Sequence, residues 1–405
     1  MTNYIILALC IVVILSYIFD ISGRYSKIPG VILLIFLGIA LQLIAKAVHL
    51  DVPDLQPVLP VIGTLGLIMI VLEASLDLKL EKRKKALIIK SISSAFILFA
   101  VFSAALTYIL MEFFGSNIKV SLLNAIPLGI ISSSVAISSA AHLKPDEKEF
   151  VVYESSFSDI FGIIIFDFIL ISHGTIGQGI LDMGLKSIIT IIIALVTTGI
   201  LAILLHKITY HVNYVIIMTA VVLVYILAKL SHLPALLLVL IFGLVLSNNQ
   251  FFENTPIKKY VDFAKFRSDI KSFKTILTEL TFLVRSFFFI IFGFYAKIEG
   301  LYNWHNILTG GAITAGIFLL RLLFFRQVIR TRLIPLVFFS PRGLITILLF
   351  LSIPLVSRIS LINEEVITLV ILFTIFVLMI GNMVSGKNRP PAVKKEADSE
   401  NAGVH

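Results

Sequence analysis

The sequence is poor in cysteine and in charge, and each shortage excludes a class of protein. It has one cysteine, Cys10, so no disulfide can form within the chain. Only 14% of the 405 residues are charged, whereas 58% are hydrophobic and the mean hydropathy is +1.03. Soluble domains of this length do not have such a composition, and apolar runs of about twenty residues recur along the chain. These features predict a polytopic membrane protein.

Several functional signals are also missing from the sequence. Residues 1–19 lack the basic start and the small-residue cleavage site of a signal peptide, so we expect them to form the first span. No soluble nucleotide-binding domain is recognisable, so we expect no ATP-driven step and no cofactor. No pair of histidines has metal-ligand spacing, so no metal is expected beyond a transported cation. The net charge of +9 lies in the loops, so nucleic acid is not an expected partner.

The apolar runs predict an all-α protein with about thirteen transmembrane helices. The predicted spans are residues 3–20, 29–48, 57–78, 86–111, 120–142, 150–173, 184–206, 212–230, 233–247, 275–297, 305–325, 332–356 and 363–384. The loop 248–274 mixes basic and aromatic residues, which fits an amphipathic segment on the membrane surface or a plain connector with a solvated basic face. Residues 385–405 contain prolines and mixed charges and are expected to form a disordered tail.

Lysine and arginine are distributed unevenly between the alternating loops. The loops on one side carry 23 of these residues and those on the other side carry 4, while the remaining 6 of the 33 lie within spans. Short cytoplasmic loops carry the positive excess. We therefore predict that the amino terminus is outside and the carboxyl terminus cytoplasmic, in a bacterial inner membrane.

The fifth and sixth predicted spans hold polar side chains at membrane depth, where ionisable residues mark functional sites. Asp159 lies near the middle of the sixth span, with Ser155 one turn earlier on the same face and Ser158 beside it. Ser133 and Ser134 lie near the middle of the fifth span. A carboxylate with hydroxyls suits a small hard cation, and the carboxylate can hold a proton instead. A site that takes either ion is the minimum for exchange; the alternatives are a structural carboxylate and close helix packing by the serines.

The twelfth predicted span contains a Pro-Arg-Gly sequence around Arg342 near its centre, where a helix is expected to break. The fifth span has Pro127 and Gly129 before its serines. The two spans have opposite orientations, as an inverted repeat requires, and transporters build midplane sites from such pairs. We therefore predict inverted repeats with two discontinuous helices that cross at the midplane. Arg342 is expected to offset the charge of a helix end or of Asp159.

Three charged residues are expected to lie at one depth in the membrane. Glu154, Arg321 and Glu73 each lie slightly more than one turn inside the cytoplasmic end of a span. Glu154 and Arg321 are therefore predicted to form a structural ion pair, because a buried charge without a partner is costly. Snorkelling of Arg321 to the headgroups is the alternative.

These residues make the chain resemble the sodium/proton exchanger (NhaP/Kef-like) group of the monovalent cation:proton antiporter superfamily. The family's sixth-span signature has Glu followed four and five residues later by Asn-Asp, which resembles Glu154 to Asp159. The fifth-span hydroxyl stretch resembles the serines found here. The third-span acidic residue resembles Glu73, the eleventh-span arginine Arg321, and the Arg-Gly of the twelfth span Arg342. The resemblance covers nearly all predicted spans.

The chain departs from the family pattern at two points. Ser158 replaces the asparagine of the signature, and the fifth span has serines where one branch has a threonine and an aspartate. The serine stretch is therefore more similar to the potassium-efflux side of the superfamily. By analogy, a single carboxylate at Ser158–Asp159 implies one-for-one, electroneutral exchange.

The resemblance also implies an architecture and a division of roles. The membrane exchanger domain would span residues 1–384 of a homodimer, with the tail 385–405 outside it. Interface helices would occupy about 3–78 and 212–297, a mobile core about 86–173 and 305–384, and a linking helix 184–206. Asp159 would carry the cation and the proton. The assisting residues at the cation site would be Ser155, Ser158, Ser133, Ser134 and Glu73.

The predicted function is secondary active antiport of a monovalent cation for H⁺ by alternating access, with a role in pH homeostasis. Na⁺ is the first choice of cation, and K⁺ and Li⁺ are the alternatives. A sodium-coupled solute symporter on a similar fold is a second hypothesis, although it needs a roomier polar cavity. A membrane-embedded hydrolase using the Ser132–Ser134 run with His142 is a third, although no Gly-x-Ser-x-Gly elbow lies nearby.

Overall fold

The computed structural model describes residues 2–26, 29–49, 54–78, 84–140, 143–171, 176–207, 213–248, 263–329 and 335–386. All regular structure in these ranges is helical, which confirms the predicted all-α fold. The first half comprises α1 (Thr2–Ser26), α2 (Gly30–Ala47), α3 (Leu59–Asp77), α4 (Lys85–Phe114), α5 (Ile118–Gly129), α6 (Ser133–Ser139) and α7 (Pro145–Ile171). The second half comprises α8 (Ile176–Lys207), α9 (Asn213–Leu230), α10 (Ala235–Ser247), α12 (Phe263–Phe294), α13 (Ile298–Leu301), α14 (Trp304–Phe324), α15 (Leu344–Ser352) and α16 (Glu364–Gly386).

Seven helical stretches of the described chain are long and apolar enough to cross a membrane. They are α2, α3, α4, α5 with α6, α12, α14 and α16. Helix α7 is not among them, because it carries three carboxylates within membrane length, at Glu154, Asp159 and Asp167. Hydropathy alone therefore passes over the helix that carries Asp159.

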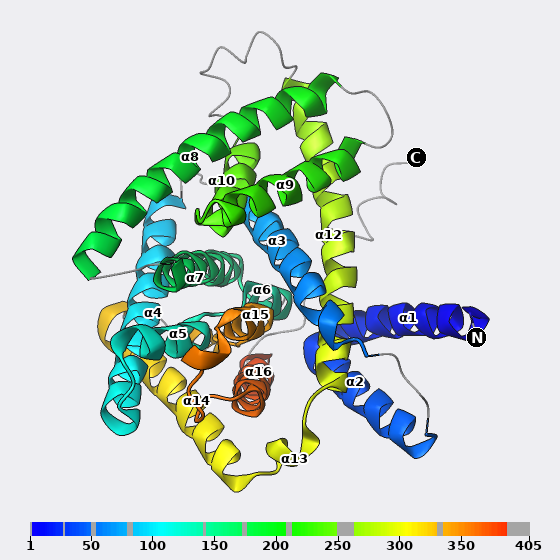
Figure 1. The fold of residues 1–405 in the computed structure, drawn as a ribbon, viewed down its shortest axis with the longest axis vertical. Coiled ribbons are helices and arrows are strands. Elements are labelled where there is room, and N and C mark those ends of the chain that lie inside the picture. Colours follow the sequence, from blue (N-terminus) through cyan, green and yellow to red (C-terminus); the bar gives the residue numbers. More distant parts are fainter. Residues whose placement is uncertain are drawn as a thin grey trace, which may run out of the picture.

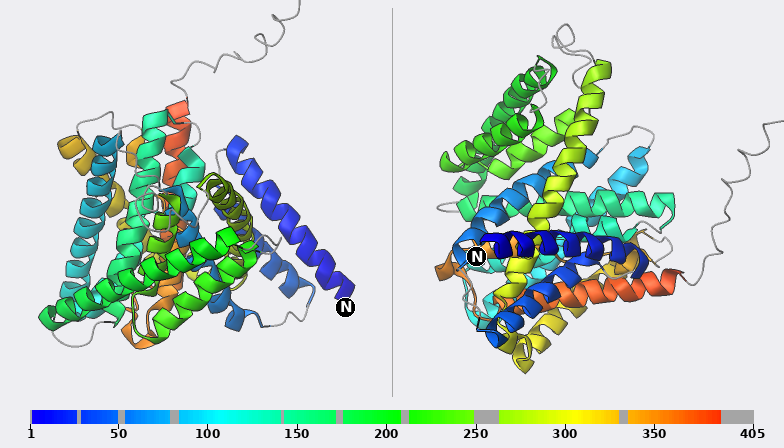
Figure 2. Two further views of the ribbon diagram at one scale, coloured as in Figure 1. Left: turned by 90° about the horizontal axis from the view of Figure 1, so that it is seen from above. Right: turned by 90° about the vertical axis from the view of Figure 1, so that its right-hand side faces the viewer.

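The helices pack in two groups, and each group contains helices from both halves of the chain (Figures 1 and 2). In one group α12 packs against α2 and α3, and α10 packs against α3 and α8. In the other group α4 packs against α5 and α7, and α14 packs against α16. Helices α5, α6 and α15 lie between α7 and α16, both of which are seen nearly end-on in Figure 1. The assignment of these groups to an interface and a mobile core remains a prediction.

Helix α12 is longer than the sequence suggested. We expected a loop over residues 248–274 and a span from residue 275, but residues 263–274 belong to the helix. Ile270, Phe273 and Leu277 repeat at helical spacing, and the last two are 1% and 0% exposed. The charged residues between them obscured this apolar stripe. The rest of the loop, the tail from residue 387 and His142 lie outside the described residues.

Both predicted helix breaks are present, and they meet. Helix α5 ends at Gly129 and α6 begins at Ser133, while an extended segment precedes α15 at Leu344. The backbone N–H of Ser132 donates to the carbonyl oxygen of Pro341 at 2.8 Å, so the two broken segments are hydrogen-bonded where they cross. The prediction of two discontinuous helices that cross is confirmed, and one backbone donor freed by the first break is satisfied across the crossing.

Candidate functional site

Asp159 lies on α7 beside the crossing of the broken helices. Its side chain is 3% exposed, and Oδ2 accepts a hydrogen bond of 3.3 Å from the backbone N–H of Ser133, the first residue of α6. The other oxygen, Oδ1, is buried and has no hydrogen-bond partner among the described residues. Asp159 therefore retains an acceptor that a cation or a proton can occupy.

The serines beside Asp159 on α7 have different partners. The hydroxyl of Ser155 donates to the carbonyl oxygen of Val151 at 2.7 Å, on its own helix. The hydroxyl of Ser158 accepts from the backbone N–H of Ile131 at 2.9 Å, which ties α7 to the break between α5 and α6. Both side chains are 1% exposed. Both hydroxyls are thus engaged with backbone, although each keeps lone pairs free.

Glycine lets α7 approach the break this closely. A Cβ atom added to Gly162, one turn after Asp159, would collide with the side chain of Ile130 between α5 and α6. Any larger residue would push α7 away from Ser133 and lengthen the hydrogen bond to Asp159.

A small cavity lies against Asp159 on the side away from α6. Its volume is about 10 Å³, which is the scale of a single water molecule. Only two of its lining side chains are polar, Asp159 and Ser156. The hydroxyl of Ser156, which is 0% exposed, has no hydrogen-bond partner in the described part of the chain. The remaining walls are apolar residues of α3, α7, α10 and α15.

A funnel of about 660 Å³ opens at the end of the bundle where α3 and α16 begin and α12 and α15 end. Its mouth carries Lys229, Lys297, Arg358, Glu364 and Glu365. Its walls are formed by α3, α12, α15 and α16, so it lies between the two groups of helices. Water and ions can therefore enter the bundle from this end.

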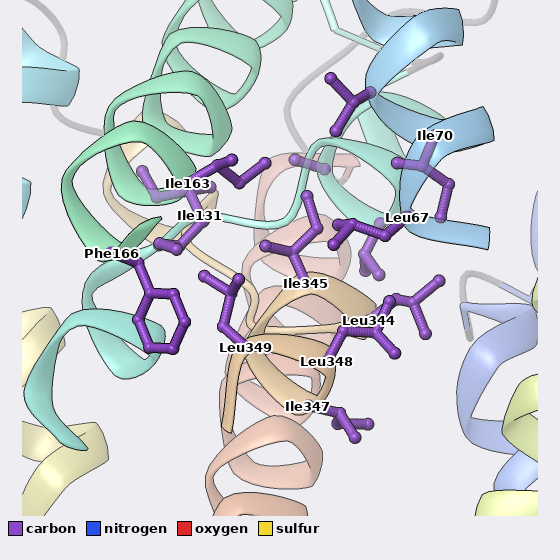
Figure 3. Close-up of a cluster of buried hydrophobic side chains, with 14 of the residues drawn as sticks. Leu67, Ile70, Ile131, Ile163, Phe166, Leu344, Ile345, Ile347, Leu348 and Leu349 are labelled. Carbon is purple, nitrogen blue, oxygen red and sulfur yellow. The ribbon is translucent and has the colours of Figure 1, made fainter. Parts of the chain in front are cut away.

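An apolar layer separates the funnel from the Asp159 cavity. We define it as Leu67, Ile163, Ile345 and Leu348, of which Leu67 and Leu348 line the funnel and the other two line the cavity. Figure 3 shows Ile345 of α15 between Ile163 of α7 and the α3 side chains. All four side chains are buried. In this conformation the layer closes the route from the funnel to Asp159.

Glu154 and Arg321 form a buried ion pair between α7 and α14. Arg321 Nη2 lies 2.6 Å from Glu154 Oε2, and Nη1 lies 3.0 Å from Oε1. Both side chains are 1% exposed. The hydroxyl of Ser94 on α4 donates to Oε1 at 2.5 Å, and Arg321 also donates to the carbonyl oxygen of Leu336 and stacks on Phe325. The pair thus joins three helices and the segment before the second break.

Arg342 neutralises a helix end. Its Nε donates to the carbonyl oxygen of Leu128 at 2.6 Å and Nη2 donates to that of Gly129 at 3.4 Å, at the carboxyl end of α5. Nη1 donates to the carbonyl and the hydroxyl of Ser340. A cation is favourable where unpaired carbonyls end a helix. Of the two roles expected for Arg342, these contacts favour the helix end over Asp159.

Glu73 lies away from the central carboxylate, on the face of α3 that packs against α12. Its Oε1 accepts a hydrogen bond of 2.9 Å from the hydroxyl of Thr278, and the positive charge of Arg285 acts favourably on it. One turn further along α3, Asp77 pairs with Lys274 of α12. Glu73 and Asp77 of α3, with Thr278, Lys274 and Arg285 of α12, form a polar strip between these two helices.

The predicted site residues are thus only partly brought together. Ser133, Ser155 and Ser158 surround Asp159, whereas Ser134 is half-buried and contacts the hydroxyl of Ser132 at 3.2 Å. Sequence reasoning missed Ser156, although it lies three residues before Asp159 and helical spacing places the two on one face. It also missed Ser94, whose partner is sixty residues away along the chain.

Gly343 is expected to be intolerant of substitution. A Cβ at this position would meet Ser132 Oγ and would lie 2.9 Å from Ser132 Cβ, so the crossing strands cannot keep their separation. We expect Gly343→Ala to lower the free energy of unfolding by about 1–3 kcal/mol, as overpacking does. Thermal unfolding of the purified protein measures the change.

Gly316→Ala on α14 is the matched control, because no atom of the described residues lies within 4 Å of an added Cβ there. This variant is expected to be as stable as the wild type or slightly more stable, since alanine favours a helix. Equal melting temperatures for the two variants would show that the crossing is looser than described.

Comparisons with known proteins identify the family and the fold. The sequence profile of a family described as "Sodium/hydrogen exchanger, transmembrane" matches residues 9–386. The fold is similar to that of the sodium proton antiporter MjNhaP1 from Methanocaldococcus jannaschii in its structure at pH 8, with a TM-score of 0.67, 18% identity, and 96% of this chain and 97% of that chain covered. An electron-microscopy structure of the same antiporter gives a TM-score of 0.66 at 19% identity, with 96% of each chain covered. A comparison with functionally curated proteins finds no match.

Proposed function

The chain belongs to the sodium/hydrogen exchanger family, and from this premise we propose that it exchanges Na⁺ for H⁺ at Asp159 by alternating access. Family membership makes it an integral multi-pass membrane protein and a secondary transporter rather than an enzyme. The alternative of a serine hydrolase is therefore set aside. The observation that supports the proposed site is a buried carboxylate with one oxygen held by Ser133 and the other without a hydrogen-bond partner in the described ranges.

Competition at one carboxylate couples the two ions. A cation and a proton both neutralise Asp159, and they cannot occupy Oδ1 together. An uncompensated carboxylate in the membrane interior is costly, so the core is expected to move only when it is loaded with one of the ions. Each cycle then exchanges one cation for one proton, and transport is electroneutral.

The funnel supports a conformation that is open toward one side. With the amino terminus outside, as the loop charges favour, the funnel opens to the exterior and the polar strip of Glu73 lies on the cytoplasmic half. We further propose that the protein works as a homodimer in a bacterial inner membrane. In this arrangement α4, α5, α6, α7, α14, α15 and α16 move against the other helices.

Size argues against the symporter alternative. The cavity at Asp159 holds about 10 Å³, and its walls are apolar apart from two side chains. An organic solute needs a pocket of several hundred cubic ångströms, roughly 300 Å³ or more, with several placed polar groups. The site therefore suits a single small ion.

Reconstituted protein tests the proposal directly. Liposomes with an acidic lumen and a trapped pH dye are expected to become alkaline inside when Na⁺ is added outside, and protein-free liposomes are not. Li⁺ and K⁺ in place of Na⁺ identify the preferred cation. An imposed membrane potential is expected to leave the rate unchanged if exchange is electroneutral. The proposal fails if none of the three cations changes the internal pH.

A further inference from the structure

We propose that the hydroxyl of Ser156 is a direct ligand of the transported cation and sets the affinity for the cation without setting the affinity for the proton. The inference rests on the proposed exchange at Asp159 and adds to it a residue that determines specificity. Ser156 is separate from Ser155 and Ser158, the serines that the sequence suggested.

Two buried polar side chains line one small cavity. Ser156 Oγ and Asp159 Oδ1 are both buried, and neither has a hydrogen-bond partner among the residues that the structure describes. Both side chains line the same cavity of about 10 Å³. A buried hydroxyl without a partner is unfavourable, and an ion in a cavity that such a hydroxyl lines can satisfy it. An ion in this cavity can contact both oxygens.

The helix fixes the two oxygens relative to each other. Ser156 and Asp159 are three residues apart on α7, which places them on one face of the helix about one turn apart. Helix α7 is anchored before Ser156 by the Glu154–Arg321 pair, and between Ser156 and Asp159 by the hydrogen bond from Ile131 to Ser158. The separation of the oxygens is thus set by the scaffold before an ion arrives.

The neighbouring serines are less suited to this role. The Ser155 hydroxyl donates its only proton to Val151 at 2.7 Å, and the Ser158 hydroxyl accepts from the Ile131 backbone at 2.9 Å. Neither side chain lines the cavity. Ser156 is the one serine of this cluster that lines the cavity and whose hydroxyl has no hydrogen-bond partner within the described chain.

A cation and a proton differ in what they require from the site. A proton binds covalently to one oxygen of Asp159 and needs no further ligand. A dehydrated cation needs several oxygen ligands, and a cavity this small leaves room for at most about one water molecule. The other walls are apolar residues of α3, α10 and α15, so the loss of a single hydroxyl cannot be compensated there. Removing the Ser156 oxygen should therefore weaken cation binding selectively.

The test compares two substitutions at Ser156 in the full-length protein in proteoliposomes. Ser156→Ala removes the oxygen, and Ser156→Cys nearly keeps the volume but replaces a hard oxygen with a soft sulfur, which is a poor ligand for Na⁺. For both variants the KM for Na⁺ is expected to rise about tenfold, the size of one lost interaction with a charged group. The kcat and the pH at which protons begin to compete should stay close to those of the wild type.

Ser103→Ala on α4 is the matched control. Ser103 is also buried, at 4% exposed, and its hydroxyl also lacks a partner among the described residues, but it does not line the Asp159 cavity. Its KM for Na⁺ is expected to equal that of the wild type. Stabilisation of each purified variant against heat by Na⁺ gives a second readout that does not depend on transport, because an ion that binds only the folded state raises the melting temperature.

The possible results separate this inference from the proposed exchange. An unchanged KM and unchanged Na⁺ stabilisation in Ser156→Ala, with an active wild type, would overturn the ligand role alone. A wild-type KM in Ser156→Cys beside a raised KM in Ser156→Ala would assign the effect to packing and would also overturn it. A wild type that exchanges no cation would overturn both. If Ser156→Ala fails to fold, Ser156→Cys alone decides between the outcomes.

Discussion

The Asp159→Asn variant is expected to lose cation-driven proton exchange down to the level of protein-free liposomes. The amide has nearly the shape of the carboxylate, and its oxygen can still accept the hydrogen bond of 3.3 Å from Ser133 N–H. It carries no charge to attract a cation and it does not take up a proton near neutral pH. The melting temperature should therefore stay near that of the wild type while transport stops. Dye-loaded proteoliposomes and thermal unfolding measure the two properties.

Asp167→Asn is the matched control on the same helix. Asp167 is only partly buried, near the funnel, and its charge acts on Lys229 rather than on the crossing of the broken helices. This variant is expected to keep most of the exchange. Equal activity of the wild type and Asp159→Asn would show that another residue carries the ions. Loss of exchange in Asp167→Asn alone would assign this role to Asp167.

The second large effect is expected at Arg321. Arg321→Met leaves Glu154 as an unpaired charge that is 1% exposed, and it also removes two hydrogen bonds to the carbonyl oxygen of Leu336. Breaking a buried ion pair from one side costs about 3–5 kcal/mol. We expect a loss of folding stability of that size, measured by thermal or denaturant unfolding in detergent.

The double variant Glu154→Gln with Arg321→Met distinguishes the charge from the packing. It should recover part of the lost stability, because no buried charge remains unpaired. Lys84→Met is the control, since the Lys84–Glu149 pair is about one-third exposed on both sides and surface pairs contribute less than about 1 kcal/mol. Similar losses for Arg321→Met and Lys84→Met would contradict a special role of the buried pair.

Several features could be read from the sequence because they depend on local chemistry or on depth alone. Pro127 lies in the last turn of α5, and the Pro-Arg-Gly sequence at Arg342 lies just before α15. Proline disfavours a continuous helix, so both breaks could be predicted. Glu154 and Arg321 lie at one depth, and burial then leaves them few partners other than each other. The depth of a residue in the membrane follows from its position along a span, and a helix break follows from the local sequence. Neither prediction requires knowledge of the neighbouring helices.

Rotation of helices about their axes could not be read in the same way. Glu73 and Ala74 are adjacent, yet Glu73 faces Thr278 of α12 while Ala74 lines the Asp159 cavity. Successive side chains are rotated by about 100° around the helix axis, so a site residue and its neighbour in the sequence point to different partners. Which face of α3 meets α7 is decided by tertiary packing. The same reason explains why Ser156 was passed over in favour of Ser155 and Ser158.

Protons cross proteins by hopping along chains of hydrogen-bonded water, and the apolar layer interrupts any such wire. Leu67, Ile163, Ile345 and Leu348 offer no donor or acceptor side chain between the funnel and Asp159. Narrow apolar constrictions expel water and block conduction in this way. A proton in the funnel then reaches Asp159 only when the layer opens, so the closed protein does not conduct protons. In the absence of the exchanged cation, protons would therefore not leak through the protein, and the proton gradient across the membrane would be kept.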